Sequence, residues 1–331
     1  MTGRIDVHAH SMGPAFRSAI QAIGGIIRTP EWSPELALQH MDRHAISAGV
    51  LSLSTPGVHL GDDAKARSLA QRVNAEAVGY IQKWPKRFGA FGTLPIPDIE
   101  GACREVAHAL DDLKLEGIGM LASYEGKYLG HPDFDPVLAE LDKRSAVVLI
   151  HPNNHPSTHE VRKGISEGIG NFLVEFLFDT TRAALNLLFM DALHRFPNIR
   201  WILCHAGGTL PFVAWRISDI ASRQMIHSPW DTQYPSAYMA RHGAGLTQAQ
   251  VLADFKRFYF ETALSAGRQS LASTREVAAP ERILFGSDWP YCPDDMTDDM
   301  ISATTTSGFF DEKQLAAVNH GNAARLFPRL A

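Results

Sequence analysis

The sequence lacks the features that mark membrane, secreted and nucleic-acid-binding proteins. No apolar run approaches the roughly 20 residues that a transmembrane helix needs, and too few residues precede His8 to form a cleavable signal peptide. The formal net charge is −5 over 331 residues, and no cluster of lysine and arginine offers a basic surface to nucleic acid or anionic lipid. We therefore expect a cytoplasmic protein that acts on a small molecule.

Cysteine is also scarce, and internal repeats and low-complexity segments are missing. The three cysteines are odd in number, far apart and outside any C-x-x-C spacing: Cys103, Cys204 and Cys292. This pattern argues against a disulfide framework and against a zinc site built from thiolates. With 45% hydrophobic and 20% charged residues, the chain has the composition of an ordinary globular protein, and we expect residues 1–331 to form a single domain.

Short apolar or β-branched runs alternate with longer segments of helical periodicity along the chain. Eight runs have the length and composition of strands: residues 5–7, 50–54, 88–94, 117–121, 147–150, 199–204, 258–261 and 283–286. Eight strands that alternate with helices predict a (β/α)8 barrel of the TIM type. An open doubly wound sheet is the alternative, although no G-x-G-x-x-G motif follows the first run.

The segments between these runs carry helix signals. Pro34 stands in the first turn of one predicted helix, with Ser33 as its N-cap. Further helices are predicted over residues 63–84, 99–113, 134–143, 180–196 and 312–327. Two long loops are predicted as lids or interface segments, over residues 11–32 and 222–245.

Five metal-binding or acid–base side chains fall at the ends of predicted strands, where α/β barrels carry their reacting groups. They are His8 and His10 on the first strand, His151 after the fifth, His205 after the sixth and Asp288 after the eighth. In an extended strand alternate side chains share a face, so His8 and His10 offer imidazole nitrogens to one ion. The sequence therefore predicts a metal site at the carboxyl ends of the strands, with His8, His10, His151 and Asp288 as ligands.

Imidazole and carboxylate ligands suit Zn²⁺, Mn²⁺ or Fe²⁺, and four of them leave positions open for water or substrate, as in a catalytic site. We predict one divalent metal ion, with zinc as the first choice and manganese as the alternative. His205 is either a fifth ligand or a catalytic residue beside the ligands that moves a proton or orients Asp288. Glu261, at the end of the seventh predicted strand, either steadies His205 or accepts hydrogen bonds from nearby backbone amides.

Five motifs spanning nearly the whole chain resemble those of a known superfamily. They are Asp-Val-His-Ala-His at 6–10, His-Pro-Asn at 151–153, His-Ala-Gly-Gly-Thr-Leu-Pro at 205–211, Phe-Gly-Ser-Asp-Trp-Pro at 285–290 and Gly-Asn-Ala-Ala-Arg-Leu-Phe at 321–327. At these positions the chain resembles the amidohydrolase superfamily, in particular its aminocarboxymuconate-semialdehyde-decarboxylase-like branch. The resemblance implies a distorted barrel, a single divalent metal and often a homodimer.

Within that branch the chain is similar to the 6-methylsalicylate decarboxylases of polyketide pathways. The similarity rests on residues 54–57, 128–131, 146–152, 181–184, 204–211 and 278–280. Two-metal members of the superfamily commonly carry a bridging carboxylated lysine after the fourth strand. Residues 118–124 contain no lysine, so the resemblance implies a site with one metal.

Three further positions bear on the substrate. Arg216 matches an arginine that the aminocarboxymuconate-semialdehyde enzymes use to bind substrate across a dimer interface, and a guanidinium fork suits a carboxylate. The alternative is a surface arginine paired with Asp219 on the same helix. Ala37 and Gln39 stand where those enzymes carry arginines for a second carboxylate, so the resemblance disfavours a dicarboxylate substrate.

The predicted activity is the metal-dependent, non-oxidative decarboxylation of an ortho-hydroxy aromatic acid of the salicylate or 6-methylsalicylate type. The metal would hold the substrate as template and Lewis acid. Asp288, carrying a proton and steered by His205, would protonate the ring carbon. Four aromatic side chains are candidates for the pocket walls, with a position in the ordinary core as the alternative for each: Phe16, Trp32, Phe176 and Trp289.

Two other functions stay open. The same ligands lower the pKa of a bound water, so hydrolysis of a C–N, C–O or vinylogous C–C bond of a small carboxylic acid is the main alternative. A non-catalytic binding protein would be expected to have lost a ligand, and none is missing from this sequence. His155 and His159, which follow His151 in a proline- and asparagine-rich stretch, are expected to be loop residues.

Overall fold

Eight parallel strands form the centre of the structure, a computed structural model that describes residues 3–24, 29–166, 169–223 and 236–331. Their order in the sheet is β1-β2-β3-β4-β7-β8-β9-β10. The strands are β1 (Arg4–His10), β2 (Ile46–Ser52), β3 (Phe88–Thr93), β4 (Gly117–Leu121), β7 (Val147–His151), β8 (Arg200–Leu203), β9 (Tyr259–Glu261) and β10 (Ile283–Leu284). Each of the eight predicted runs contributes a strand, and a short hairpin of β5 (Ser123–Tyr124) and β6 (Lys127–Tyr128) was not predicted.

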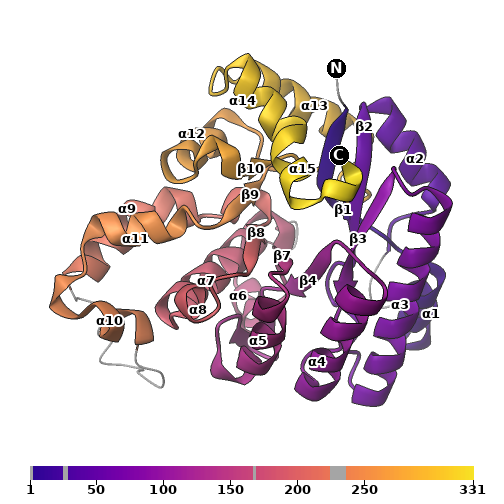
Figure 1. Ribbon diagram of the computed structural model, residues 1–331, viewed down its shortest axis with the longest axis horizontal. Coiled ribbons are helices and arrows are strands. Elements are labelled where there is room, and N and C mark those ends of the chain that lie inside the picture. Colours follow the sequence, from indigo (N-terminus) through magenta and orange to yellow (C-terminus); the bar gives the residue numbers. More distant parts are fainter. Residues whose placement is uncertain (1–2, 25–28, 167–168, 224–235) are drawn as a thin grey trace.

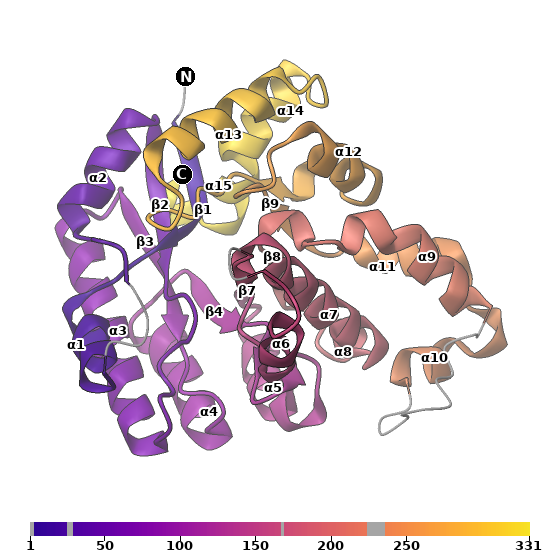
Figure 2. The same ribbon diagram turned by 180° about the vertical axis from the view of Figure 1, so that it is seen from behind.

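The first and last strands come together and nearly close the sheet into a barrel. The amide of Val7 donates to the carbonyl of Phe285 at 3.0 Å, and the amide of Asp288 donates to the carbonyl of His8 at 2.7 Å. Helices surround the strands in both views (Figures 1 and 2). The prediction of a (β/α)8 barrel is therefore confirmed, and the open doubly wound sheet is wrong.

The helices cover the outside of the barrel and its two ends. Their bounds are α1 (Pro14–Ala22), α2 (Pro34–Arg43), α3 (Asp63–Lys83), α4 (Ile99–Ala107), α5 (Asp135–Lys143), α6 (Pro156–Arg162), α7 (Glu175–Phe189), α8 (Ala192–Arg195), α9 (Leu210–Ser222), α10 (Ala237–His242), α11 (Gln248–Phe255), α12 (Arg268–Val277), α13 (Asp294–Thr306), α14 (Glu312–Ala316) and α15 (Asn322–Leu326). Across the described ranges, none of these helices has the length and apolar character needed to span a bilayer.

The predicted helices are present, with local differences. Ser33 caps α2 by accepting a hydrogen bond from the amide of Leu36. The helix predicted over residues 180–196 begins earlier, at Glu175, and breaks at Asp191. Asp191 has a φ of 60°, a left-handed conformation that interrupts a right-handed helix. One predicted helix therefore becomes two, α7 and α8.

Segments predicted as loops contain helices. Residues 11–32 include α1, and residues 222–245 include α10. The prediction that these two segments are lids or interface segments falls partly on residues 25–28 and 224–235, which lie outside the described residues. His155 and His159 belong to α6, the first as its N-cap and the second within it. These helices are short, so their periodic signal in the sequence is weak.

The barrel interior is a packed apolar core, covered at one end by the C-terminal segment. Val147 and Leu149, alternate residues of β7, pack in one buried cluster with Phe327. Arg329 donates to the carbonyl of Phe88, the first residue of β3, at 2.8 Å, so this segment lies at the amino ends of the strands. The carboxyl ends of the strands, on the opposite side, carry the polar side chains that follow each strand.

Strand β1 contains an irregularity that simple alternation does not predict. Its pairing with β2 shifts register between Asp6 and Ala9, which accommodates an extra residue. Val7 consequently packs in the interior apolar cluster, while the next residue, His8, faces the polar group at the end of the strand. The bulge lets β1 supply both core side chains and two histidines.

Candidate active site

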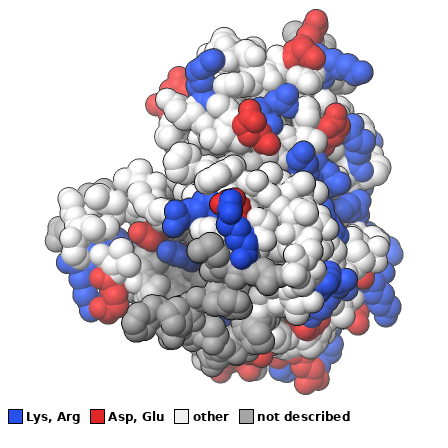
Figure 3. Space-filling view, turned by 90° about the vertical axis from the view of Figure 1, so that its left-hand side faces the viewer, with Lys and Arg blue, Asp and Glu red and all other residues white. Residues whose placement is uncertain are grey.

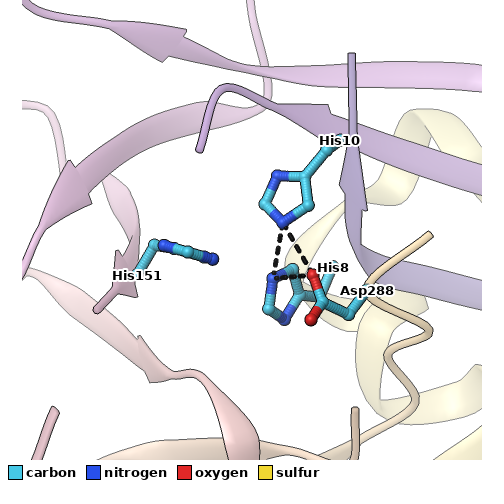
Figure 4. A group of neighbouring side chains, drawn as sticks. All are labelled: His8, His10, His151 and Asp288. Atoms are coloured by element: carbon cyan, nitrogen blue, oxygen red, sulfur yellow. Dashed lines mark hydrogen bonds and ion pairs between the residues drawn. The ribbon is translucent and has the colours of Figure 1, made fainter. Parts of the chain in front are cut away.

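The four side chains predicted as metal ligands meet at the carboxyl end of the barrel. Those of His8, His10, His151 and Asp288 are buried, and one ligand atom of each lies within 4.8 Å of the others. Nε2 of His10 lies 3.0 Å from Nε2 of His8 and 2.9 Å from Oδ1 of Asp288. His151 points toward this group from the other side (Figure 4). Two ligands bound about 2.1 Å from one ion lie about 3.0–3.4 Å apart, so the spacing fits a shared metal.

The second ring nitrogen of each histidine has a fixed partner. Nδ1 of His8 lies 2.9 Å from Oε1 of Glu261, and Nδ1 of His10 lies 3.1 Å from Oγ of Ser52. Nδ1 of His151 lies 2.8 Å from the carbonyl oxygen of the next residue. These partners can hold the ring proton on Nδ1 and leave Nε2 free to bind a metal. Together with one carboxylate, the three imidazoles suit a divalent ion.

Asp288 enters the site from a tight turn that follows β10. Its φ is 60°, and the preceding Ser287 donates to Asp6 from its hydroxyl at 2.5 Å and from its amide at 3.1 Å. A Cβ at Gly286 would lie 2.1 Å from Oε2 of Glu261, so only glycine fits there. Asp6 and Gly286 thus fix the turn that presents Asp288.

Charges within the group set the protonation of two ligands. Burial raises the pKa of Asp288, but the charge of His8 and hydrogen bonds from His10 and His205 outweigh it and hold this pKa well below its usual value. Burial, followed by the positive charges of neighbouring histidines, lowers the pKa of His151 well below its usual value. Asp288 is therefore ionised and His151 neutral at pH 7, as metal ligands must be.

His8 behaves differently when no ion is bound. Burial lowers its pKa, but Cys204, Glu261 and Asp288 outweigh burial and raise the pKa well above its usual value. A metal at Nε2 of His8 must displace this proton, so metal binding releases a proton and strengthens as pH rises.

His205 lies beside Asp288 and outside the group of four. Its Nε2 is 3.5 Å from Oδ2 of Asp288, whereas the other oxygen contacts the first two histidines. Its Nδ1 is buried and has no hydrogen-bond partner within the described ranges. The backbone of His205 has a φ of 53°, a strained conformation that often occurs at functional sites. Its position agrees with the second predicted role, next to the ligands.

Glu261 connects His8 to the turn that carries His205. Its Oε1 contacts Nδ1 of His8 and also accepts from the amide of His205 at 2.5 Å, and its Oε2 accepts from the amide of Ala263 at 2.6 Å. Both predicted roles of Glu261 are therefore present: it bonds to backbone amides, and one of them steadies His205. Its contact with His8 was not predicted.

A cavity of about 580 Å³ opens onto the ligands. Its walls are mostly apolar and consist of Ser54, Thr55, His151, Phe172, Leu173, Phe176, Leu177, His205, Leu264, Asp288, Tyr291 and Met296. Among the four predicted wall residues, Phe176 lines this cavity. The other three are not among these wall residues: Phe16 and Trp32 lie in the core, as the alternative prediction had it, and Trp289 stacks on His40 with 5.1 Å between ring centroids.

Arg216 lies away from this cavity, on the exposed side of α9. The alternative prediction, an ion pair with Asp219, is wrong, because Asp219 pairs with Arg223 at 3.1 Å. On the same helix Phe212 and Trp215 expose 81% and 68% of their surface. Arg216 is therefore not among the residues that line the cavity of its own chain.

Sequence reasoning missed several residues that support the ligands or shape the cavity. Ser52 gave no signal, because serine is common on any strand. Asp6 did give a signal, because it is an acidic residue inside an apolar strand. Its partner Ser287 is 281 residues away, so the sequence did not show the contact. Tyr291 lines the cavity, and its ring centroid lies 5.3 Å from that of His10.

Comparison with known proteins places the chain in a family. A sequence model of the amidohydrolase family matches residues 5–329. The 6-methylsalicylic acid decarboxylase acuB of Aspergillus aculeatus is 33% identical over 343 residues, which cover 99% of this chain and 96% of the relative. The chain belongs to the amidohydrolase family, as the resemblance implied.

Two solved structures share the fold over their whole length. A 2,6-dihydroxybenzoate decarboxylase complexed with 2,6-dihydroxybenzoate has a TM-score of 0.78 and 25% identity, with 99% of this chain and 100% of that chain covered. A dihydroxybenzoic acid decarboxylase from Polaromonas sp. JS666, with bound manganese and the inhibitor 2-nitroresorcinol, has a TM-score of 0.81 and 24% identity, with 99% and 97% covered. All of these proteins are named as decarboxylases of hydroxylated aromatic acids, the class of activity predicted from the sequence.

Proposed function

We propose that this protein is a metal-dependent, non-oxidative decarboxylase of an ortho-hydroxy aromatic acid of the salicylate or 6-methylsalicylate type. The observation that carries the proposal is the buried group of three histidines and one aspartate that meets a largely apolar cavity of about 580 Å³. Apolar walls suit one aromatic ring, and the polar group suits its carboxylate and hydroxyl. The names of the relatives support the same activity.

In the proposed reaction a proton replaces the carboxylate on one ring carbon. His8, His10, His151 and Asp288 would hold a divalent ion, which would supply Lewis-acid positive charge for the substrate oxygens. Asp288 and His205 form the proton-donating pair, with Oδ2 of Asp288 facing Nε2 of His205. The proton adds to the ring carbon that bears the carboxylate, the bond to carbon dioxide then breaks, and its electron pair restores the aromatic ring.

Within this pair, His205 supplies the proton that Asp288 passes to the ring. Because the pKa of Asp288 is held well below its usual value, its carboxyl is ionised before substrate binds. Nε2 of His205 lies next to that carboxylate and can donate a proton to it.

Metal-loaded protein is expected to convert salicylate to phenol, or 6-methylsalicylate to 3-methylphenol, with equal release of carbon dioxide. In deuterium oxide one deuterium should enter the ring at the carbon that lost its carboxylate. Carbon dioxide release and mass spectrometry of the phenol measure both products. The assay uses metal-free protein refilled with zinc or with manganese, because we propose zinc as the metal and the ligand set also accepts manganese.

Hydrolysis would give a different result in the same experiment. A hydrolase produces two organic fragments from one substrate and no carbon dioxide, and its substrates would be amides, esters or vinylogous ketones. Such products, together with no turnover of any hydroxybenzoate in a panel, would replace the proposed activity. Protein that is folded but binds no divalent ion would instead favour the non-catalytic alternative.

We also propose that the protein forms a homodimer through α9, which brings Arg216 of one subunit to the cavity of the other. Two large apolar side chains next to Arg216, those of Phe212 and Trp215, are mostly exposed, as is common where a partner covers them. Figure 3 shows the side of the molecule on which α9, α10 and α11 lie, where basic and acidic side chains are scattered among uncharged ones. Such a surface suits a protein interface better than nucleic acid.

Arg216→Ala is expected to raise KM for the hydroxybenzoate about 10- to 100-fold, because a charged hydrogen-bond partner of the carboxylate is lost. Metal content and fold should not change, and kcat should change little. Arg223→Ala is the matched control, since Arg223 pairs with Asp219 on the same helix. Sedimentation velocity of both variants reports the dimer, and an unchanged KM would make Arg216 a simple surface residue.

A further inference from the structure

A second group of metal-binding side chains lies at the opposite end of the barrel from the active site. His194 is on α8, His242 on α10 and Asp254 on α11, and one ligand atom of each lies within 4.8 Å of the others. Helices α8 and α11 end shortly before β8 and β9 begin, so this group is near the amino ends of the strands. His205 and Glu261 follow or end the same strands at their carboxyl ends. Figures 1 and 2 both show α10 at the edge of the molecule, away from the strands.

The partners of His194 show which of its nitrogens faces the group. Nδ1 lies 2.9 Å from Oδ1 of Asp191, which accepts the ring proton. In a neutral ring Nε2 then carries a lone pair, yet it faces Oδ1 of Asp254 at 3.3 Å. Two acceptors that face each other repel unless a proton or a cation lies between them. A distance of 3.3 Å is also that of two ligands on one ion.

Further side chains fix the orientation of these groups from behind. The hydroxyl of Tyr238 donates to Oδ2 of Asp254 at 2.8 Å, which leaves Oδ1 facing His194. Asp191, which orients His194, is held by Arg241 through Nε at 2.7 Å and Nη2 at 2.6 Å. A carboxylate behind a histidine and a hydroxyl behind a carboxylate are the usual supports of metal ligands.

His242 provides the third ligand atom, a ring nitrogen, and this residue has a nitrogen with no competing partner. Its Nε2 is buried and makes no hydrogen bond to any residue that the structure describes. Its ring centroid lies 6.0 Å from that of His194 and 4.6 Å from that of Tyr238. An unpartnered buried ring nitrogen is unfavourable, and a bound cation would satisfy it. The guanidinium of Arg257 stays 3.8 Å from Oδ1 of Asp254, beyond hydrogen-bond distance.

We propose that His194, His242 and Asp254 bind a second divalent ion with a preference for imidazole ligands, of which zinc is the natural probe. Two imidazoles and one carboxylate leave a position for water. The ion joins three short helices, and it fixes α10, which follows the undescribed residues 224–235, to α8 and α11. Because α11 packs on α9, the site stabilises the part of the fold that carries Arg216.

A similar group between α2 and α13 also has a buried ring nitrogen without a described partner, Nε2 of His40, but its other atoms are already paired. There His40, His44 and Asp294 lie together, but Arg43 already pairs with Asp294 at 3.4 Å. Both nitrogens of His44 contact backbone carbonyls, at 2.8 Å and 3.2 Å. A cation at that position would compete with Arg43 for the carboxylate, so the proposal is limited to the group on α8, α10 and α11.

Zinc stoichiometry tests the proposal. Metal-free wild-type protein, titrated with zinc against a chromogenic chelator, is expected to bind two equivalents per chain. His242→Ala and His10→Ala are each expected to bind one, and the double variant none. Asp254→Asn keeps an acceptor for Tyr238 but removes the charge, and it too should bind one. His108→Ala, at a half-buried position outside both groups, should still bind two.

Thermal unfolding gives a second measurement that does not depend on activity. Zinc is expected to raise the melting temperature of wild type above that of Asp254→Asn, and a chelator should abolish the difference. A folded His242→Ala or Asp254→Asn that binds as much zinc as wild type would overturn the proposal, and so would a folded His10→Ala that binds none. Because the readout is metal content, the result is independent of the reaction at the other site.

Discussion

Replacing His10 with alanine is expected to remove the active-site metal and to lower kcat/KM on the order of 10³-fold or more. Nε2 of His10 lies within 3.0 Å of ligand atoms of both His8 and Asp288, so its loss removes the donor at the centre of the group. The remaining ligands lose affinity, because three donors hold a divalent ion less tightly than four. Mass spectrometry of bound metals and steady-state decarboxylation rates measure the two effects together.

The control for His10→Ala is a histidine with no link to the site. His108 is half-buried, far from the site in sequence and on a different structural element, and its Nδ1 lies 3.2 Å from Oδ2 of Asp112, so His108→Ala should keep both metal and activity. His10 is fully buried, and circular dichroism must therefore show that the variant has folded. A folded His10→Ala that retains its active-site metal and its rate would disprove the ligand assignment.

The fold was predictable because its signals are local. The run at 147–150 is apolar and rich in β-branched residues, as strands are, and seven similar runs alternate with helices. The break at Asp191 was not predictable in the same way. Its side chain is held by His194 and by Arg241, and Arg241 lies 50 residues away, so the left-handed backbone there depends on tertiary contacts.

The positions of the predicted ligands were also accessible from the sequence, whereas their supports were not. In a barrel every strand ends on the same side, so His151 and Asp288 meet whatever their distance in sequence. The contact of His8 with Glu261 requires the register of non-neighbouring strands to within one residue, and a bulge in β1 changes that register. Hydrophobic periodicity does not fix either feature.

The cavity walls were the weakest prediction, for a simple physical reason. An aromatic residue is expected to be buried, but burial does not say which cavity or core it joins. Phe16 and Trp32 joined the core, while residues near the start of α7, such as Phe172 and Leu173, line the cavity. These residues precede or begin a helix, where sequence patterns give little information on the direction in which a side chain points.

The position of His205 connects the geometry to the proposed chemistry. Oδ1 of Asp288 contacts His8 and His10, whereas His205 faces the other carboxylate oxygen, which favours a place beside the ligands over a fifth ligand. The cavity is lined by both His205 and Asp288. A substrate ring in that cavity would therefore meet the proton-donating pair and the metal ligands at the same time.

His205→Ala is accordingly expected to lower kcat by about 10²- to 10⁴-fold, the usual contribution of a positioned acid or base, while the active-site metal is retained. Asp288 keeps its place, because its amide is bonded to His8 and the turn before it is bonded to Asp6. Without the donor, proton transfer to the ring becomes rate-limiting, so the solvent deuterium isotope effect on kcat should increase and added imidazole should restore part of the rate.

His159→Ala, on the exposed face of α6, is the control. Loss of the active-site metal from His205→Ala would place this histidine among the ligands, and an unchanged rate would mean that Asp288 receives its proton from another source.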